Sequence, residues 1–528
     1  MKRHGSFLAL SPISRSRRVV LAFIAGCIAV SGWAPLAWWP ISLACYAALF
    51  FLLLNTSETQ QSIAVGLAFA IGLHGTGSSW IYTAMHDKVH RGALGAWLSA
   101  CVFILYVAAF TALSSALFFY LKSSVTHRLR AQSPWTQFIV AVHFSSAFAL
   151  GEYGRTLLFN GFTSLSLGFS LVDTWFAGFA PIGGIYLVSW VGFLLASLAA
   201  LVIRYRAQPY LWGSFLVAIA GLIVISYALS TTQWVQPTGQ VLSFRLLQLN
   251  LRQDAKDDPH TQAVYANHLT QLIEQQAANI IATPETALPA HLHHWTNDQL
   301  ARLQAFSNAS SSHLMVGTTT IQADAQGFNT VLHLAPQPSQ AGDNMGAIQQ
   351  YHKVRLMPFG EYSPTGFSWF TRNLSISNKE LVAGPATQHP FAVEGQRIGL
   401  LICQEDMDAA QARYWVQGPR DASILLNPSN FAWFDGTLAL EQWVQVVQMR
   451  ALEVGRPILR IANTGVTVHI NPFGKVVQRL PTSEEGVLVG NVQGYTGSTW
   501  YARWGEIWLL VLIVLLGVHH VRHHLRFL

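Results

Sequence analysis

Long apolar runs are concentrated at the two ends of the chain. They cover residues 19–34, 36–54, 62–82, 93–121, 135–152, 183–203, 211–229 and 505–521. A helix that crosses the ~30 Å hydrocarbon layer of a membrane needs about 20 mostly apolar residues. The runs therefore predict a multi-helix transmembrane bundle of about eight helices, seven before residue 235 and one near the C-terminus. Because almost no loop separates the first two runs, six early helices are an alternative, and residues 155–180 could be re-entrant or interfacial.

From residue 241 onward the apolar runs become short and are bounded by turn residues. Runs that predict strands cover residues 243–251, 279–285, 313–321, 330–335, 397–405, 422–428, 458–465, 466–474 and 486–492. Apolar residues at helical spacing predict helices over 260–277, 297–309 and 438–454. Strands that alternate with helices indicate a layered α/β domain, and the absence of fingerprint glycines argues against a dinucleotide-binding domain.

Composition supports this division into a membrane part and a soluble part. Of the 528 residues, 51% are hydrophobic and only 11% are charged, which is too apolar for an ordinary soluble protein. The patterns predict an N-terminal transmembrane domain over residues 1–235, an outer α/β domain over 236–504, and a C-terminal transmembrane helix with a short tail over 505–528.

The basic residues predict how the chain is oriented in the membrane. With the N-terminus inside, the cytoplasmic segments carry Lys2, Arg3, Arg15, Arg17, Arg18, Lys122, Arg128, Arg130, Arg204, Arg206, Arg522 and Arg526. The short outer loops carry only Lys88, Arg91 and Arg155. Because Lys and Arg are enriched in cytoplasmic loops, this bias places both termini inside the cell and residues 236–504 outside.

The net charge of +7 does not indicate a nucleic-acid partner. Residues 236–504 hold 17 Lys and Arg against 20 Asp and Glu, so the outer domain is slightly acidic. The excess positive charge flanks the apolar runs, where it matches a membrane surface. We therefore expect no nucleic-acid binding.

Cysteine usage singles out one residue of the outer domain. Cys27, Cys45 and Cys101 lie in predicted membrane helices, where a cysteine packs as a small apolar residue. Cys403 alone lies in the outer domain, in an oxidising compartment, with no second cysteine there to form a disulfide. It is therefore either a buried structural cysteine or a nucleophile.

Polar residues with catalytic chemistry lie at the ends of three short segments of the outer domain. Glu285 lies in TPETALP, Lys353 in YHKVRLMPFGEY and Cys403 in LLICQEDMD. Residues at strand ends can converge on one edge of a sheet. A catalytic cysteine needs a base or a positive neighbour, and Glu285 and Lys353 could supply these. Taken singly, Glu285 could cap a helix, Lys353 could be solvated, and Glu405 could be a surface carboxylate.

Four motifs in order carry a family resemblance. TPETALP, YHKVRLMPFGEYSP, GLLICQED and MRALEVGRPILRIANTGVT resemble the apolipoprotein N-acyltransferase family, membrane enzymes whose outer domain belongs to the nitrilase superfamily. The seven-plus-one arrangement of apolar runs matches this family as well. The resemblance implies that the outer domain is a nitrilase-like αββα sandwich.

The resemblance also implies a set of site residues. The catalytic triad would be Glu285, Lys353 and Cys403, with Glu361 and Glu405 as supporting carboxylates. Phe367, Trp369 and Phe370 would form a lid or contact substrate at the bilayer surface, where Trp is favoured, although plain core packing is the alternative.

The implied reaction is a two-step acyl transfer. Cys403 would take an acyl chain from a membrane phospholipid, typically phosphatidylethanolamine, and the resulting thioester would acylate the α-amine of a diacylglyceryl-cysteine apolipoprotein. This chemistry needs no metal and no organic cofactor. The implied setting is the bacterial inner membrane, with the catalytic domain on the periplasmic side of a monomeric protein.

At four positions the sequence differs from the usual motifs of the family, and because of these differences other functions are also considered. They are Thr283, Gln404, Phe431 and Trp443, which we expect to line the substrate pocket. The alternatives are a membrane-anchored nitrilase-like amidase, a paralogous acyltransferase with a different acceptor, and a transporter with an outer binding domain. A transporter would carry charged residues along its spans, yet charge is nearly absent from the runs, where Glu152 lies near the end of one.

Overall fold

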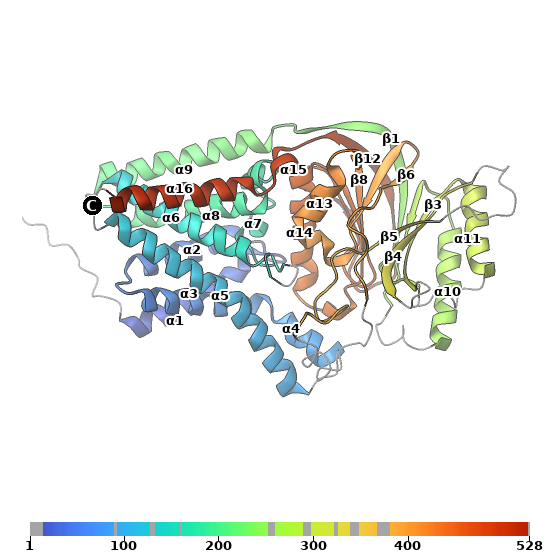
Figure 1. Cartoon of the computed structure of the whole chain (residues 1–528), viewed down its shortest axis with the longest axis horizontal. Helices are drawn as coiled ribbons and strands as arrows, with labels where there is room; N and C mark the ends of the chain where they lie inside the picture. The colour runs from blue at the N-terminus through green and yellow to red at the C-terminus, as the bar shows by residue number, and fades with distance from the viewer. Residues whose placement is uncertain are drawn as a thin grey trace, which may run out of the picture.

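The computed structural model describes residues 14–88, 92–126, 133–158, 161–251, 259–288, 297–321, 326–337, 348–366 and 381–525. Long helices from both ends of the chain lie side by side at one end of an elongated molecule, and two β-sheets lie at the other end (Figure 1). The C-terminal helix therefore returns to the helices formed by the first 230 residues.

A long helix forms over each predicted apolar run. These helices are α1 (Arg15–Ala29), α2 (Trp39–Leu54), α3 (Thr59–Gly77), α5 (Ala93–Thr126), α6 (Pro134–Gly154), α8 (Ala180–Arg204), α9 (Pro209–Ser230) and α16 (Ile507–Leu525). Short helical segments between them are η1 (Val30–Gly32), α4 (Trp80–Thr83), η2 (Ala84–Lys88), α7 (Leu167–Ser170), η3 (Trp175–Phe179) and α15 (Trp500–Trp504).

Among the described residues, three helical stretches are long and apolar enough to cross a membrane. They are Ala93–Val125, Trp175–Arg204 and Pro209–Ser230, and shorter apolar helices cover Trp39–Leu54 and Ile507–Val518. The total of about eight crossings stays a prediction.

Small residues allow close packing of the bundle. A side chain at Gly26 of α1 would collide with the backbone oxygen of Phe69 in α3, and one at Gly72 would collide with that of Phe23. Such close approach of backbones is how helices associate in lipid, where hydrophobic burial gives little driving force.

Between Val235 and Gly497, the described residues form two six-stranded sheets. The first has the order β12-β1-β2-β3-β4-β5, and the second has the order β11-β10-β9-β8-β7-β6. Their strands are β1 (Val235–Gln248), β2 (Ile280–Ala282), β3 (His313–Ile321), β4 (Gly327–Leu334), β5 (Gln349–His352), β6 (Phe391–Val393), β7 (Gln396–Leu400), β8 (Ile424–Ser429), β9 (Ile458–Ala462), β10 (Val468–Ile470), β11 (Val476–Arg479) and β12 (Gly486–Gly497).

Successive side chains along the strands pack on opposite faces of each sheet and so form the layers of the domain. Leu246, Ile280 and Met315 belong to the core between the sheets, whereas their neighbours Leu247 and Ile281 pack against helices on the outer face. Those helices are α10 (Pro259–Glu274) and α11 (Asn297–Ser310), and the second sheet is covered by α13 (Ala409–Val416) and α14 (Ala439–Val454). The two sheets and these helices thus form the expected αββα sandwich (Figure 1).

Several predicted strands are shorter than expected, including those over 458–465 (Ile458–Ala462) and 466–474 (Val468–Ile470), and two of these changes concern the candidate site. The strand predicted over 279–285 ends at Ala282, and the strand predicted over 397–405 ends at Leu400. The residues that follow leave the sheets and form loops. Glu285 and Cys403 therefore lie beyond the strand ends and not within the strands.

Helix α14 joins the sandwich to the membrane helices. Glu453 is fully buried and its Oε1 accepts a hydrogen bond of 2.8 Å from the backbone N–H of Ile185. That N–H can bond outside its own helix because Gly183 and Gly184 interrupt the helical conformation of α8. Near the middle of α14, Oε1 of Gln445 accepts a 3.1 Å bond from the N–H of Ala34.

Candidate active site

A buried lysine lies between two carboxylates. Lys353 follows β5 directly and is only 2% exposed. Its Nζ lies 3.1 Å from Oε1 of Glu285 and 2.9 Å from Oε2 of Glu361. Glu285, which is distant in the sequence, therefore meets Lys353 and the nearby Glu361 at one edge of the first sheet.

Asn329 of β4 completes this cluster and was not predicted. Its Nδ2 donates to Oε1 of Glu285 at 2.7 Å and to Oε1 of Glu361 at 2.8 Å. The one available signal was a single amide within the mostly apolar strand GFNTVLHL. The amide keeps the two carboxylates apart and oriented toward the lysine.

The charge state of Lys353 follows from this geometry. Burial by itself lowers the pKa of a lysine, but Glu285, Glu361 and Cys403 raise the pKa of Lys353 well above its ordinary value. The ammonium therefore stays protonated at neutral pH and can stabilise negative charge.

Cys403 opens a short 3-10 helix, η6 (Cys403–Met407), and has a φ of +53°. A left-handed backbone is unusual for a residue with a Cβ and costs roughly 1 kcal/mol. The conformation is held in part by Asn427, whose Nδ2 donates to the backbone oxygen of Cys403 at 3.0 Å. Strain of this kind is often found at functional sites.

The thiol of Cys403 interacts with the lysine cluster. Burial and the charge of Glu285 raise the pKa of Cys403 well above its ordinary value, although Lys353 and a hydrogen bond from the backbone of Asn430 act to lower it. The resting residue is consequently a thiol. It requires a proton acceptor in order to act as a nucleophile.

Glu405 is buried and not a surface carboxylate. Its Oε1 accepts from the N–H groups of Val354 at 2.7 Å and Arg355 at 3.0 Å. Its Oε2 accepts from the N–H of Ile402 at 2.7 Å and the hydroxyl of Tyr351 at 2.9 Å. Burial raises the pKa of Glu405 to about 7. The carboxylate ties the segment after Lys353 to the segment before Cys403.

Replacing Glu405 by glutamine should destabilise the protein. One oxygen becomes an NH2 group that faces two hydrogen-bond donors, and a buried donor without an acceptor costs about 1–3 kcal/mol. The free energy of unfolding should fall by at least this amount, as thermal or chemical unfolding would show. Glu441→Gln is the control, because Glu441 pairs with Arg479 at the surface. Equal stability of the two variants would contradict this role of Glu405.

A second buried acid, Asp406, anchors the other side of η6 and was not predicted. Nε1 of Trp443 donates to its Oδ1 at 3.3 Å, and Nη2 of Arg460 lies 3.6 Å from its Oδ2. Burial raises the pKa of Asp406 to about 6. The contact with Trp443 attaches the nucleophile segment to α14.

Three of the four departures from the family wording are buried near this site. Thr283 accepts a 2.9 Å hydrogen bond from the N–H of Gly317, and the rings of Phe431 and Trp443 pack with centroids 5.1 Å apart. Gln404 is half-buried within η6. The changed positions therefore surround the triad segments.

The predicted lid or substrate-contacting residues fall outside the part of the chain that the structure describes. They are Phe367, Trp369 and Phe370. Over the described ranges, no group of three or more His, Cys, Asp or Glu side chains is arranged to hold a metal ion.

Comparison with known proteins gives matches over nearly the whole chain. Residues 25–201 match the family model of the apolipoprotein N-acyltransferase N-terminal domain, and residues 246–501 match that of carbon-nitrogen hydrolases. The apolipoprotein N-acyltransferase of Nitrosomonas europaea is 31% identical over 94% of this chain and 96% of its own. That of Ralstonia nicotianae is 32% identical over 94% of this chain and 91% of its own.

Among solved structures, an amidase of the nitrilase superfamily from Nesterenkonia is 18% identical, with a TM-score of 0.37 over 52% of this chain and 97% of its own. The family assignment depends on the sequence relatives, which match both the membrane part and the sandwich. The chain belongs to the apolipoprotein N-acyltransferase family.

Proposed function

We propose that this protein transfers an acyl chain from a membrane phospholipid, with phosphatidylethanolamine as the typical donor, to the N-terminal amine of diacylglyceryl-cysteine apolipoproteins. The observation that carries the proposal is the position of Lys353, between Glu285 and Glu361 and in electrostatic contact with the thiol of Cys403. A nucleophile, a base and a cation for the oxyanion are thus available at one place.

In the first step the thiol of Cys403 attacks the ester carbonyl of the phospholipid. Glu285 accepts the thiol proton while the carbon–sulfur bond forms, and Lys353 stabilises the negative oxygen of the tetrahedral intermediate. The carbon–oxygen bond of the ester then breaks. The departing alkoxide takes the proton from Glu285 and leaves as a lysophospholipid, so that a thioester remains on Cys403.

In the second step the α-amine of the apolipoprotein attacks the thioester. Glu285 accepts a proton from the amine, the carbon–sulfur bond breaks, and the thiolate recovers the proton as the amide product leaves. Passing through a thioester divides one difficult substitution into two easier ones. In this scheme Glu361 and Glu405 position Lys353 and the nucleophile segment and take no part in bond making.

The same proposal includes the arrangement in the membrane. Residues 1–235 and 505–528 would span the bacterial inner membrane with about eight helices, and residues 236–504 would lie on the periplasmic side. The basic residues at the predicted cytoplasmic ends support this orientation. The protein would act as a monomer without metal or cofactor, which native mass spectrometry of the active protein can test.

The direct test is to incubate the full chain in lipid nanodiscs with phosphatidylethanolamine labelled in its acyl chains. We expect a labelled thioester on Cys403 that persists until a diacylglyceryl peptide is added. A membrane-anchored amidase would leave the lipid intact and would release product to water. A labelled thioester that reacts with a different amine and not with the peptide would indicate a paralogous acyltransferase.

Replacing Glu285 by glutamine should separate thiol reactivity from catalysis. Loss of the carboxylate removes a charge that raises the pKa of Cys403, so alkylation of Cys403 by iodoacetamide should become faster at neutral pH. Acyl transfer should nevertheless fall about 10²–10⁴-fold, because the base is lost. Peptide mapping after alkylation across a range of pH, together with single-turnover acylation, measures both effects. A variant that loses both reactivities would contradict the assignment of Glu285 as the base.

A further inference from the structure

Two charged residues at the end of α6 lie inside the helix bundle. Glu152 is 8% exposed and Arg155 is 3% exposed. Ionisable side chains within membrane segments are costly and usually functional. Neither residue takes part in the acyl-transfer chemistry described above.

Both side chains hold the same turn, residues 164–167. Oε1 of Glu152 accepts the N–H of Leu167 at 2.8 Å. Nη1 of Arg155 donates to the backbone oxygen of Ser164 at 3.2 Å, and its Nη2 donates to Oγ of Ser166 at 2.8 Å. Arg155 therefore holds the residues on both sides of Leu165, and Glu152 holds the end of the turn at Leu167.

Leu165 itself is strained. Its φ is +58°, and its side chain is only 2% exposed. A left-handed conformation at a leucine persists only where the surroundings enforce it. The bonds of Arg155 to the two residues that flank Leu165 supply this constraint.

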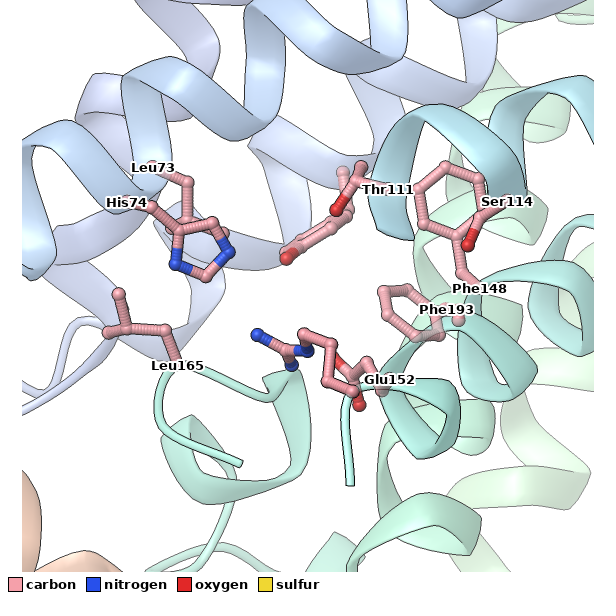
Figure 2. Close-up of a pocket in the computed structure, with 11 residues that line it drawn as sticks. Leu73, His74, Thr111, Ser114, Phe148, Glu152, Leu165 and Phe193 are labelled. Atoms are coloured by element: carbon pink, nitrogen blue, oxygen red, sulfur yellow. The ribbon is translucent and has the colours of Figure 1, made fainter. Parts of the chain in front are cut away.

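A cavity of about 20 Å³ lies next to the turn. Figure 2 shows His74 of α3, Glu152 of α6 and Leu165 around this space, with Thr111 of α5 on a further side. Nδ1 of His74 and Oε2 of Glu152 have no hydrogen-bond partner among the residues that the structure describes. A water molecule needs roughly 10–15 Å³ and at least two polar partners, and this cavity offers both.

The turn also reaches the nucleophile segment. Leu165 lines a second cavity of about 10 Å³, whose other walls include Met407 and Trp443. Met407 is the last residue of η6, which begins at Cys403. Trp443 holds Asp406 of the same segment. Leu165 thus lies between the polar cavity of the bundle and the helix that carries the nucleophile.

We propose that His74, Glu152 and Arg155 form a water-binding site inside the helix bundle, and that this site positions η6 through the 164–167 turn. One or two ordered waters bridge His74 and Glu152, and Arg155 fixes Leu165 beneath Met407. Arg155 and Glu152 are positioning residues. The second half of the proposal rests on the proposed role of Cys403, whereas the first half does not.

Hydroxyl-radical footprinting of the full chain in nanodiscs tests for the waters, because radicals formed from a bound water label the side chains beside it. Phe148 and Leu165, which are 4% and 2% exposed, line the cavity, whereas the buried Phe118 and Leu198 do not. We expect labelling of the first pair to be several-fold faster than labelling of the second. Equal rates would overturn the water site.

Arg155→Gln tests the positioning role, with Lys122→Gln as the matched control. Lys122 is also a buried cation of the bundle, but it donates to the backbone oxygens of Leu53 and Thr56 at 3.0 Å, away from the turn. Both variants should lower the Tm. Only Arg155→Gln should slow acylation of Cys403 by phosphatidylethanolamine, by about tenfold to a hundredfold, and shift the pH profile of Cys403 alkylation. Arg155→Lys should recover part of the rate.

Identical acylation rates and pH profiles for Arg155→Gln and Lys122→Gln would overturn the positioning role. If Arg155→Gln does not fold, Ser166→Ala removes one acceptor of the guanidinium and should act in the same direction to a smaller extent. If the unaltered chain forms no acyl adduct on Cys403, the proposed function fails, and the alkylation profile still decides whether Arg155 acts on η6.

Discussion

Cys403→Ala should abolish acyl transfer while leaving the fold intact. In the proposed mechanism the sulfur carries the acyl chain between the two substrates, so its loss should lower the rate at least about 10³-fold, as expected when a nucleophile is removed. Alanine removes only the Sγ atom from a half-buried position. The bond from Asn427 to the backbone oxygen of residue 403 is retained. The Tm should therefore change little.

The measurement is transfer of a labelled acyl chain to a diacylglyceryl peptide, and the matched control is Cys101→Ala. Cys101 lies in α5 and is also half-buried, and its replacement should leave the rate unchanged. Substantial turnover by Cys403→Ala would remove the thioester mechanism. Cys403→Ser gives a further check, since an oxygen nucleophile could trap an acyl ester without passing it on.

Lys353→Gln should have the second large effect, on both rate and stability. The two carboxylates beside Lys353 would lose their cation in a buried site, and removing one partner of a buried ion pair typically costs about 3–5 kcal/mol. The oxyanion would also lose its donor, which lowers the rate about 10²–10³-fold. Glutamine keeps some hydrogen-bonding capacity, so a folded fraction should remain for assay.

Chemical unfolding and single-turnover acylation by labelled phospholipid measure these two losses. Lys475→Gln is the control, because Lys475 is exposed and lies 3.9 Å from Asp173; it should change neither quantity. A Lys353→Gln variant with the stability and rate of the unaltered chain would show that the lysine is not the charge partner of the site.

The apolar pattern predicted most of the fold because it records burial directly. Long runs produced long helices, and strands such as β3 and β8 were found because every residue, or nearly every residue, is buried. Three strands were missed because they are short or largely exposed. β5 reads QQYH, β11 reads VVQR with all four residues exposed, and β6 has three residues. Their pairing depends on neighbouring strands and leaves little trace in the local sequence.

The candidate triad was found from motifs, but its surroundings were not. Glu285, Lys353 and Cys403 lie in motifs that resemble those of the family. Asn329 and Asp406 acquire their roles only through contacts with residues far away in the chain, such as the bond from Trp443 to Asp406. Sequence reasoning places a residue on an element, whereas these roles depend on how two elements are packed together.

Helix α14 is expected to make acyl transfer sensitive to the surrounding lipids. One end of the helix is fastened to the kink of α8 by Glu453, and Trp443 on the same helix holds the segment of Cys403. A bilayer whose thickness does not match the spans tilts the helices that cross it. If α8 tilts, α14 should move with it and displace the segment of Cys403. The rate of acyl transfer should therefore depend on the chain length of the surrounding lipids even when those lipids are not its substrates.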